Sequence, residues 1–222
     1  MRTAPEGQTA AATALAARYP ALWHCCFIGA WPGICAFGLH SVASLTELAA
    51  APAPLRKHVV QELRTHPERL ELPDGHHAVL RDQAPLRSRR LERHLKDIGE
   101  ADWLALLNAR VFLFNREPDV RRLLGAYKDK AEGQDVIKLK TAALLAACQG
   151  RVEVTTGNSG ALPRTTGPSR GRDTFMPLAT FPANEVGTIK EVTVLGGIDN
   201  VPALTSSVIR HHSDGTKRRI WP

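Results

Sequence analysis

The stretch GTIKEVTVLGG, residues 187–197, raises the question on which the interpretation of this chain depends. Its branched apolar residues predict a short strand, and two glycines close that strand. One carboxylate, Glu191, stands at its start. Glu191 is either a solvated charge at an edge or a catalytic carboxylate held on a rigid element, and the rest of the chain has to distinguish the two.

The composition is that of a packed domain with an excess of positive charge. The chain has 222 residues, of which 43% are hydrophobic, and this is enough for one sizeable core. We therefore expect a single domain that spans residues 1–222. The net charge of +7 favours a phosphate-bearing partner without naming one.

The sequence predicts a cytoplasmic protein without a membrane partner or a metal site. No apolar run reaches the roughly 18 to 20 residues of a membrane span, and the N-terminus lacks a signal-peptide pattern. The four cysteines form no CxxC pair, so buried reduced thiols are expected. His66, His76 and His77 have neither helical nor zinc-finger spacing, and we expect them to bind no metal.

Hydrophobic periodicity and turn residues predict a helix-rich first half and a strand-rich second half. Helices are expected at 9–18, 30–37, 41–50, 54–66, 85–108 with a break near Gly99, 118–130 and 142–150. Strands are expected at 22–27, 68–72, 77–81, 109–114, 135–141 (half-exposed), 151–156, 188–194, 204–211 and 217–221. This order favours an α+β fold with antiparallel or mixed sheets, because strands do not alternate regularly with crossover helices.

Four features of the sequence could carry chemistry. They are His24 in an apolar strand, Arg81, the Gly- and Ser-rich segment 157–172, and Glu191. Each has a structural alternative when taken alone: a core histidine, an arginine paired with Asp82, a surface loop and a solvated strand charge. A loop of about 15 residues without regular structure is nevertheless uncommon unless it is functional or disordered.

The order of these features resembles the ADP-ribosyltransferases of the histidine/aromatic/glutamate class. LWHCCFIGAWPGICAFGLHS (22–41) is similar to the histidine-bearing first strand of that class, with its following helix and Gly-Leu turn. Four later segments resemble, in succession, the DarT-like members and their uncharacterised bacterial relatives: WLALLNARVFLFNREPDVRRLL, VIKLKTAALLA, VEVTTGNSGALPRTTGPSRGRDTF and IKEVTVLGGI. The resemblance runs from about Tyr19 to Val208. It implies an ADP-ribosyltransferase-like split β-sandwich with a helix-rich N-terminal half.

This resemblance implies an NAD-dependent mono-ADP-ribosyltransferase. Such an enzyme cleaves the bond between nicotinamide and ribose in NAD and transfers ADP-ribose to an acceptor. Glu191 would be the catalytic carboxylate that faces the ribose as positive charge develops there. His24 would position the ribose on the adenosine side, and Gly38, Leu39 and Phe112 would line the NAD site.

Arg81 is our expected ligand for the pyrophosphate of NAD. A guanidinium fork matches paired phosphate oxygens better than an ammonium group does. Two rivals for this role stay open, Arg87 and Arg110.

The irregular segment 157–172 precedes the glutamate strand, where relatives of this class recognise the acceptor. We expect acceptor contacts from Asn158, Ser159, Arg170 and Arg172, and Arg164 adds to the positive charge of the loop. A nucleic-acid base, single-stranded or flipped out, is the favoured acceptor. Ile189 stands two residues before Glu191, where protein-modifying members often carry Gln or Glu. This difference makes a protein side chain a less favoured acceptor. An antitoxin or a reversing hydrolase would be a further partner if the protein is a toxin.

Two other classes of function stay open. The first is a catalytically inactive member that binds NAD or nucleic acid as a binding module. The second is a helical DNA-binding protein that uses RSRRLERHLK (87–96), with Arg87, Arg90 and His94 on its contact face. A solvated helix face explains that run equally well.

Overall fold

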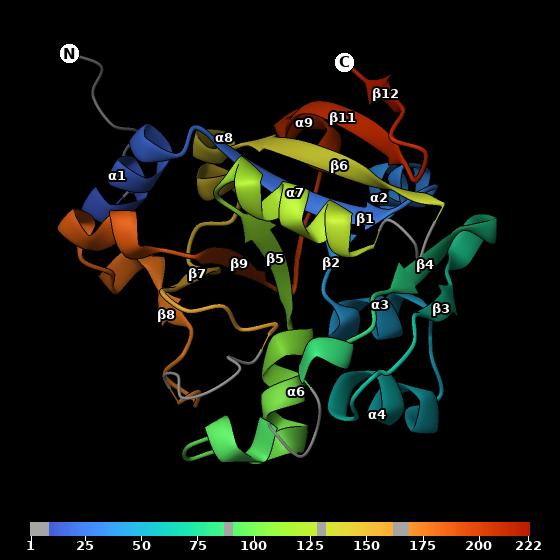
Figure 1. Ribbon diagram of the computed structural model, residues 1–222, viewed down its shortest axis with the longest axis horizontal. Coiled ribbons are helices and arrows are strands. Elements are labelled where there is room, and N and C mark those ends of the chain that lie inside the picture. Colours follow the sequence, from blue (N-terminus) through green and yellow to red (C-terminus); the bar gives the residue numbers. More distant parts are fainter. Residues whose placement is uncertain (1–8, 87–90, 128–131, 162–168) are drawn as a thin grey trace.

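One large antiparallel sheet organises the computed structural model, which describes residues 9–86, 91–127, 132–161 and 169–222 (Figure 1). The eight strands lie in the order β12-β11-β6-β1-β5-β9-β7-β8. In that order they are Lys217–Trp221, Thr205–His212, Gly133–Lys140, Ala21–Phe27, Arg110–Phe114, Glu191–Leu195, Val152–Thr155 and Met176–Pro177. The predicted α+β class is confirmed at this level, as a mixed fold with a large antiparallel sheet.

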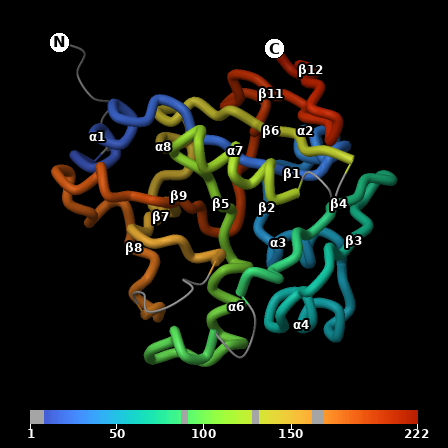
Figure 2. The backbone as a smooth tube through the Cα atoms, in the orientation of Figure 1, coloured from blue at the N-terminus to red at the C-terminus, as the bar shows by residue number. Residues whose placement is uncertain are grey.

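Two smaller sheets and several helices complete the described fold. β2 (Leu39–His40) pairs with β10 (Gly197–Ile198), and β3 (Glu68–Glu71) pairs with β4 (His77–Leu80). The α-helices are α1 (Ala10–Arg18), α2 (Ala30–Phe37), α3 (Val42–Leu48), α4 (Ala53–Gln61), α6 (Glu100–Asn108), α7 (Glu117–Ala126), α8 (Thr141–Ala147) and α9 (Val201–Leu204). The 3₁₀ turns are Pro73–Gly75, Ala84–Leu86, Glu92–His94, Leu178–Thr180 and Ala183–Thr188. In Figure 2, α3, α4, β3 and β4 form a group beside one end of the large sheet.

Local capping explains where several helices begin. The Thr9 side chain accepts a hydrogen bond from the Ala12 backbone N–H (3.3 Å), and Ser41 does the same for Ser44 (3.2 Å). Such caps satisfy backbone donors that the first turn of a helix leaves free. Pro118 stands in the first turn of α7, where its missing N–H costs no hydrogen bond.

Helices cover both faces of the large sheet. On one face, α1, α2, α8 and α9 enclose the main apolar core with alternate residues of the strands, among them Leu22, Leu113 and Val192. On the other face α7 packs through Val120 against Cys25 and neighbouring side chains of β1, β5 and β6, as its position in front of the sheet shows (Figure 1). The alternation of side chains along each strand therefore divides the residues between two packed layers.

The central strands β1 and β5 pair at only one position. Trp23 of β1 lies opposite Phe114 of β5, whereas β1 pairs with β6 along its whole length. Just past this point the His24 ring nitrogen Nδ1 lies 3.0 Å from the Phe112 carbonyl oxygen. The sheet therefore opens between β1 and β5, and a side chain replaces the backbone ladder there.

Some sequence expectations were wrong for tertiary reasons. Residues 85–98 were expected to be helical, but in their described part only Leu91 is α-helical, and Ala84–Leu86 and Glu92–His94 are 3₁₀ turns. Leu86 and Leu91 are drawn into the cluster around α6, and Leu95 forms a bridge with Arg170. The described part of 87–96 thus lacks the continuous helical face that the DNA-binding interpretation requires, and Arg87 and Arg90 lie outside the described residues.

Three smaller corrections concern element ends and exposure. β9 begins at Glu191 rather than at Thr188, because Ala183–Thr188 forms a 3₁₀ turn. The helix expected at 54–66 ends at Gln61. β6 was expected to be half-exposed, but it lies between β1 and β11 and is buried along most of its length.

The cysteines only partly follow the expectation of buried thiols. Cys25 and Cys148 are buried, whereas Cys35 is exposed on α2. Burial raises the pKa of the Cys25 thiol to about 12, so this group stays protonated at neutral pH. Across the described ranges, no helix has the length and apolar character needed to cross a membrane.

A buried ion pair connects β6 with β11. The Asp135 carboxylate is fully buried, and Arg210 donates to both of its oxygens at 2.8 and 2.9 Å. The Gly29 backbone N–H adds a third hydrogen bond at 3.3 Å. A buried carboxylate is stable only while such partners compensate for its lost hydration.

Replacing Arg210 with methionine should lower the free energy of unfolding by about 3 kcal/mol, because Asp135 is left buried without a counter-charge. Urea denaturation measures this loss. Arg218→Met is the matched control, because Arg218 is the exposed cross-strand neighbour of Arg210 on β12. A loss in Arg210→Met no larger than in the control would show that the ion pair contributes nothing to stability.

Candidate active site

A cavity of about 800 Å³ lies at the opening between β1 and β5. Its wall also includes parts of α2, α7, the β4 segment and the start of β9. Eight of the ten site residues expected from the sequence line it: His24, Gly38, Leu39, Arg81, Phe112, Asn158, Ser159 and Glu191. Arg170 and Arg172 are not part of its wall. The fold therefore brings together residues from six separate segments of the chain.

Glu191 is held in the cavity wall by the segment that follows β7. In the sheet it lies between Phe114 of β5 and Thr155 of β7. Its oxygen Oε2 accepts hydrogen bonds from the Ser159 hydroxyl (2.6 Å) and the Ser159 backbone N–H (3.1 Å). Its other oxygen, Oε1, makes no hydrogen bond within the part of the chain that the structure describes. One carboxylate oxygen is therefore fixed, and the other is available to a ligand.

The surroundings of Glu191 raise the pKa of its carboxyl group above the ordinary value of 4.5. Burial is the main cause, because a buried carboxylate loses hydration. The two hydrogen bonds from Ser159 and the positive charge of Arg170 act in the opposite direction, and Asp119 adds a small repulsion. Burial and these hydrogen-bonding and charged partners therefore act in opposite directions on the ionisation of Glu191.

The His24 ring is neutral at pH 7 and its tautomer is set by a backbone carbonyl. Because a carbonyl oxygen can only accept, Nδ1 carries the hydrogen in the contact with Phe112. Burial lowers the pKa of His24 to about 4, the bond to Phe112 raises it, and the charge of Arg81 lowers it. Nε2 therefore has a free lone pair and can accept a hydrogen bond from a hydroxyl group.

Arg81 follows β4 and contacts two aromatic rings that are nearly perpendicular to each other. Its guanidinium carbon is 5.1 Å from the ring centre of Phe27 and 4.2 Å from that of Tyr127. Nη2 donates to the Gln134 side chain (2.7 Å) and to the Cys25 carbonyl (3.3 Å). Nη1, by contrast, is buried and has no hydrogen-bond partner among the described residues. Such a group costs about 1–3 kcal/mol unless a ligand satisfies it.

Arg110, a rival for the anion-binding role, is occupied elsewhere. Its Nε donates to Glu153 at 2.7 Å, its Nη1 donates to the Leu106 carbonyl at 2.5 Å, and its guanidinium stacks on Phe175. These contacts leave Arg81 as the better candidate. The other rival, Arg87, lies outside the described residues.

Gly38 and Leu39 form a turn where only glycine fits. Gly38 has φ +94°, and a Cβ atom there would lie 2.7 Å from the Ile198 carbonyl oxygen. Leu39 then pairs with Ile198 across the β2–β10 ladder. The turn therefore places the end of α2 against the strand that follows β9, as part of the cavity wall.

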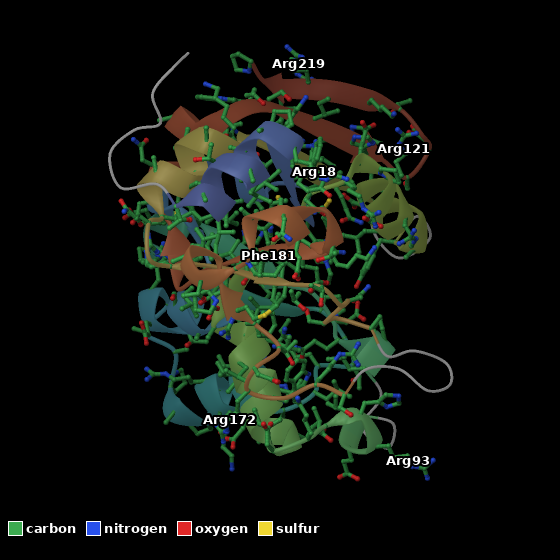
Figure 3. All side chains as sticks on the ribbon, turned by 90° about the vertical axis from the view of Figure 1, so that its left-hand side faces the viewer. Arg18, Arg93, Arg121, Arg172, Phe181 and Arg219 are labelled. Atoms are coloured by element: carbon green, nitrogen blue, oxygen red, sulfur yellow. The ribbon has the colours of Figure 1, made fainter. Side chains whose placement is uncertain are left out.

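The two described arginines of the 157–172 segment differ in exposure. Arg170 is only 7% exposed, and its Nη2 donates to the backbone carbonyls of Asn158 and Ala161. Arg172 is exposed and lies 3.6 Å from Asp102 (Figure 3). Arg164 falls outside the described residues. Arg170 is thus bonded to its own loop, and the sequence did not reveal this.

Sequence reasoning also missed several residues of the cavity. Asp119 and Tyr127, in the α7 region, line the cavity. Gln134 of β6, outside the cavity wall, accepts a hydrogen bond from Arg81. The ring of Tyr127 packs against Phe27, and its hydroxyl donates to Asp82 at 2.6 Å. Hydrophobic periodicity assigns a residue to an apolar or a polar face of a helix. It therefore does not predict that a tyrosine packs its ring against apolar groups while its hydroxyl makes a hydrogen bond.

Residues 20–205 match a family described as a family of unknown function, DUF7002. The chain belongs to this family. The matched range of this DUF7002 member contains all eight expected residues of the cavity wall. No curated protein and no solved structure matches the chain.

Acidification should destabilise the protein partly through His24. In the unfolded chain a histidine takes up a proton near pH 6.5, whereas folded His24 does so near pH 4. The stabilisation is therefore complete above pH 6.5 and is lost as pH falls towards 4, on the order of 1–3 kcal/mol. Denaturation at a series of pH values should show a shallower pH dependence in His24→Gln, while the exposed-residue control His66→Gln keeps the wild-type slope. Equal slopes in all three proteins would contradict the assigned neutral state.

Proposed function

We propose that the protein is an NAD-dependent mono-ADP-ribosyltransferase. The observation that carries this proposal is that Glu191, neutral His24 and Arg81 line one cavity, and that the buried Nη1 of Arg81 has no hydrogen-bond partner among the described residues. These three groups suit a ribose that becomes positively charged, a ribose hydroxyl and a pyrophosphate, respectively. The single pairing position between β1 and β5 further supports an ADP-ribosyltransferase-like split sheet.

The proposed reaction breaks the bond between the ribose C1′ and the nicotinamide nitrogen, and the bonding electrons leave with nicotinamide. Positive charge then develops on the ribose, and Glu191 stabilises it. A pair of unit charges about 4 Å apart contributes on the order of 4 kcal/mol at an effective dielectric constant near 20. This corresponds to a rate factor approaching a thousand. An acceptor nucleophile then bonds to C1′ and loses a proton.

His24 and Arg81 are proposed to bind and orient NAD. The lone pair on Nε2 of His24 accepts a hydrogen bond from a ribose hydroxyl, because the Phe112 carbonyl holds the hydrogen on the other nitrogen. Arg81 donates from Nη1 to a phosphate oxygen, and its contacts with the rings of Phe27 and Tyr127 keep the guanidinium in place. Both residues act on binding and orientation rather than on the bond that breaks.

The charge of the cavity wall suits an anionic substrate and a nucleic-acid acceptor. Among the described residues, six cationic side chains line it: Arg64, Arg81, Arg110, Arg116, Arg122 and Lys190. Three carboxylates of the same described ranges line it: Asp82, Asp119 and Glu191. The arginines labelled in Figure 3, by contrast, are spread over the surface, so the positive charge of the whole protein is not confined to one patch. We therefore propose that the acceptor's phosphates contact exposed cations of the cavity wall beside Glu191, namely Arg116, Arg122 and Lys190.

Glu191→Gln should reduce the release of nicotinamide from NAD by about 10²- to 10³-fold, because an amide cannot oppose the positive charge of the ribose. Release of labelled nicotinamide by the purified protein measures this. Glu185→Gln is the control, because Glu185 is exposed on the turn before β9. Wild-type release at the background rate, unchanged in Glu191→Gln, would instead favour the inactive NAD-binding module.

Arg81→Met should weaken NAD binding at least tenfold, because a pyrophosphate loses its buried donor. Calorimetric titration with NAD measures this directly, independently of turnover. Arg121→Met, which removes an exposed cation of α7 that pairs with Glu117 and is not part of the cavity wall, should change the dissociation constant for NAD less than threefold. Equal effects of the two changes would show that overall charge, not the Arg81 contact, determines binding.

A further inference from the structure

Arg170 lies behind the segment that holds Glu191. Its Nη2 donates to the carbonyl oxygens of Asn158 (2.5 Å) and Ala161 (2.6 Å). On the opposite side of the same segment, Ser159 donates from its hydroxyl and its N–H to Glu191. The segment is therefore held between a buried guanidinium and the glutamate.

A single peptide group connects the two sides. The Asn158 carbonyl and the Ser159 N–H belong to the same peptide bond, which is trans, as are all peptide bonds of the described residues. A trans peptide group is planar and its C=O and N–H point in opposite directions. When Arg170 fixes the direction of the carbonyl, it also aims the N–H at Oε2 of Glu191. Hydrogen bonds in such a chain also polarise one another.

The backbone of Arg170 is held by residues outside the 158–161 segment that its side chain contacts. Its backbone N–H donates to the His94 carbonyl at 2.7 Å, and its carbonyl accepts from the Lys96 N–H at 2.8 Å. Leu95, between these two residues, forms the corresponding bridge with Arg170. A distant segment of the chain thus sets the point from which the guanidinium reaches the loop.

Burying the charged side chain of Arg170 costs free energy, and a purely structural role does not explain that cost. It is almost fully buried, its Nη1 has no hydrogen-bond partner among the described residues, and it pairs with no carboxylate within them at ion-pair distance. Burial lowers the pKa of Arg170, and Glu191 raises it. An unsatisfied buried polar group in a native structure calls for an explanation, and function is a common one.

We infer that Arg170 is a positioning residue that acts on Glu191 through the Asn158–Ser159 peptide group. It aims the Ser159 N–H at Oε2 and holds the segment from which the Ser159 hydroxyl also donates to Oε2. Oε1 makes no hydrogen bond to the described residues. The inference rests on the proposed function for its catalytic consequence, but the geometry it describes exists without substrate.

Ser159 and Arg170 both lower the pKa of Glu191. Donors and a nearby positive charge favour the ionised carboxylate and so lower its pKa. Loss of Arg170 removes the positive charge and frees the peptide group to turn, so the pKa of Glu191 rises further. Because the ionised form is the active one, the fall in activity on the acidic side should move to higher pH.

The experiment compares Arg170→Met and Arg170→Lys with the wild type. The ionisation of Glu191 is followed by a pH titration of the ¹³C-labelled glutamate carboxyl groups, with the Glu191 signal assigned by its loss in Glu191→Gln. Nicotinamide release is measured over the same pH range. Arg93→Met is the matched control, because Arg93 is an exposed arginine next to His94 and its replacement removes one positive charge (Figure 3).

In Arg170→Met the titration midpoint of Glu191 and the acidic limb of nicotinamide release should both rise by about one pH unit or more. At neutral pH, kcat should fall about tenfold or more, with KM for NAD changed less than threefold. Arg170→Lys keeps the charge and one donor, so it should recover part of both effects. Arg93→Met should match the wild type.

An unchanged Glu191 midpoint in folded Arg170→Met would overturn the inference, even if the variant is less stable. If Arg170→Met does not fold, Arg170→Lys decides, because lysine keeps the positive charge but not the guanidinium that holds both carbonyls. A Glu191 midpoint equal to that of the wild type would then overturn the inference, whereas a raised midpoint supports it. If the wild type releases no nicotinamide, the proposed enzymatic function fails, and the carboxyl titration still decides whether Arg170 positions Glu191.

Discussion

The separation of β1 from β5 after the pair Trp23–Phe114 is the constraint on which the candidate site depends. Directly paired residues of an antiparallel sheet share a face, so Trp23, Phe114 and Glu191 lie on one face. His24, the next residue along β1, belongs to the opposite face. In a continuous sheet the two side chains would lie in different layers. Because the strands separate here, both line one cavity.

The contact that replaces the missing backbone pairing also prepares the site electrostatically. The Phe112 carbonyl accepts from His24 instead of from a strand neighbour, and this sets the tautomer of the ring. Burial keeps the ring neutral, and the same burial raises the pKa of Glu191. Ser159 and Arg170 then act against burial and favour the carboxylate. The site therefore combines a neutral base with an acid whose charge depends on its hydrogen bonds.

Local sequence patterns predicted most elements of the fold, because those elements follow from capping, periodicity and glycine placement. The helix at residues 10–18 and the strand at 21–27 lie where alanine content, a Thr9 cap and compact apolar residues place them. The helix prediction for the described part of 85–98 was wrong because Leu86 and Leu91 pack into the cluster around α6, and no local pattern indicates that contact. β6 was expected to be half-exposed because its lysines alternate with apolar residues. Two further polar residues of β6, Gln134 and Asp135, are nevertheless buried, and Asp135 pairs with Arg210, 75 residues away in the sequence.

The sequence by itself determined the chemical types of the site: a glutamate opening a strand, a histidine within another, and a glycine at a turn that needs positive φ. These depend on a residue and its immediate neighbours. Only the tertiary structure decided which arginine of the cavity wall keeps a donor without a partner among the described residues, and which arginine is turned inward to hold a loop. Arg81, Arg110 and Arg170 are chemically identical, and they differ only in which carbonyls, rings and carboxylates the fold brings to each. Those partners are distant in sequence, so local patterns carry no information about them.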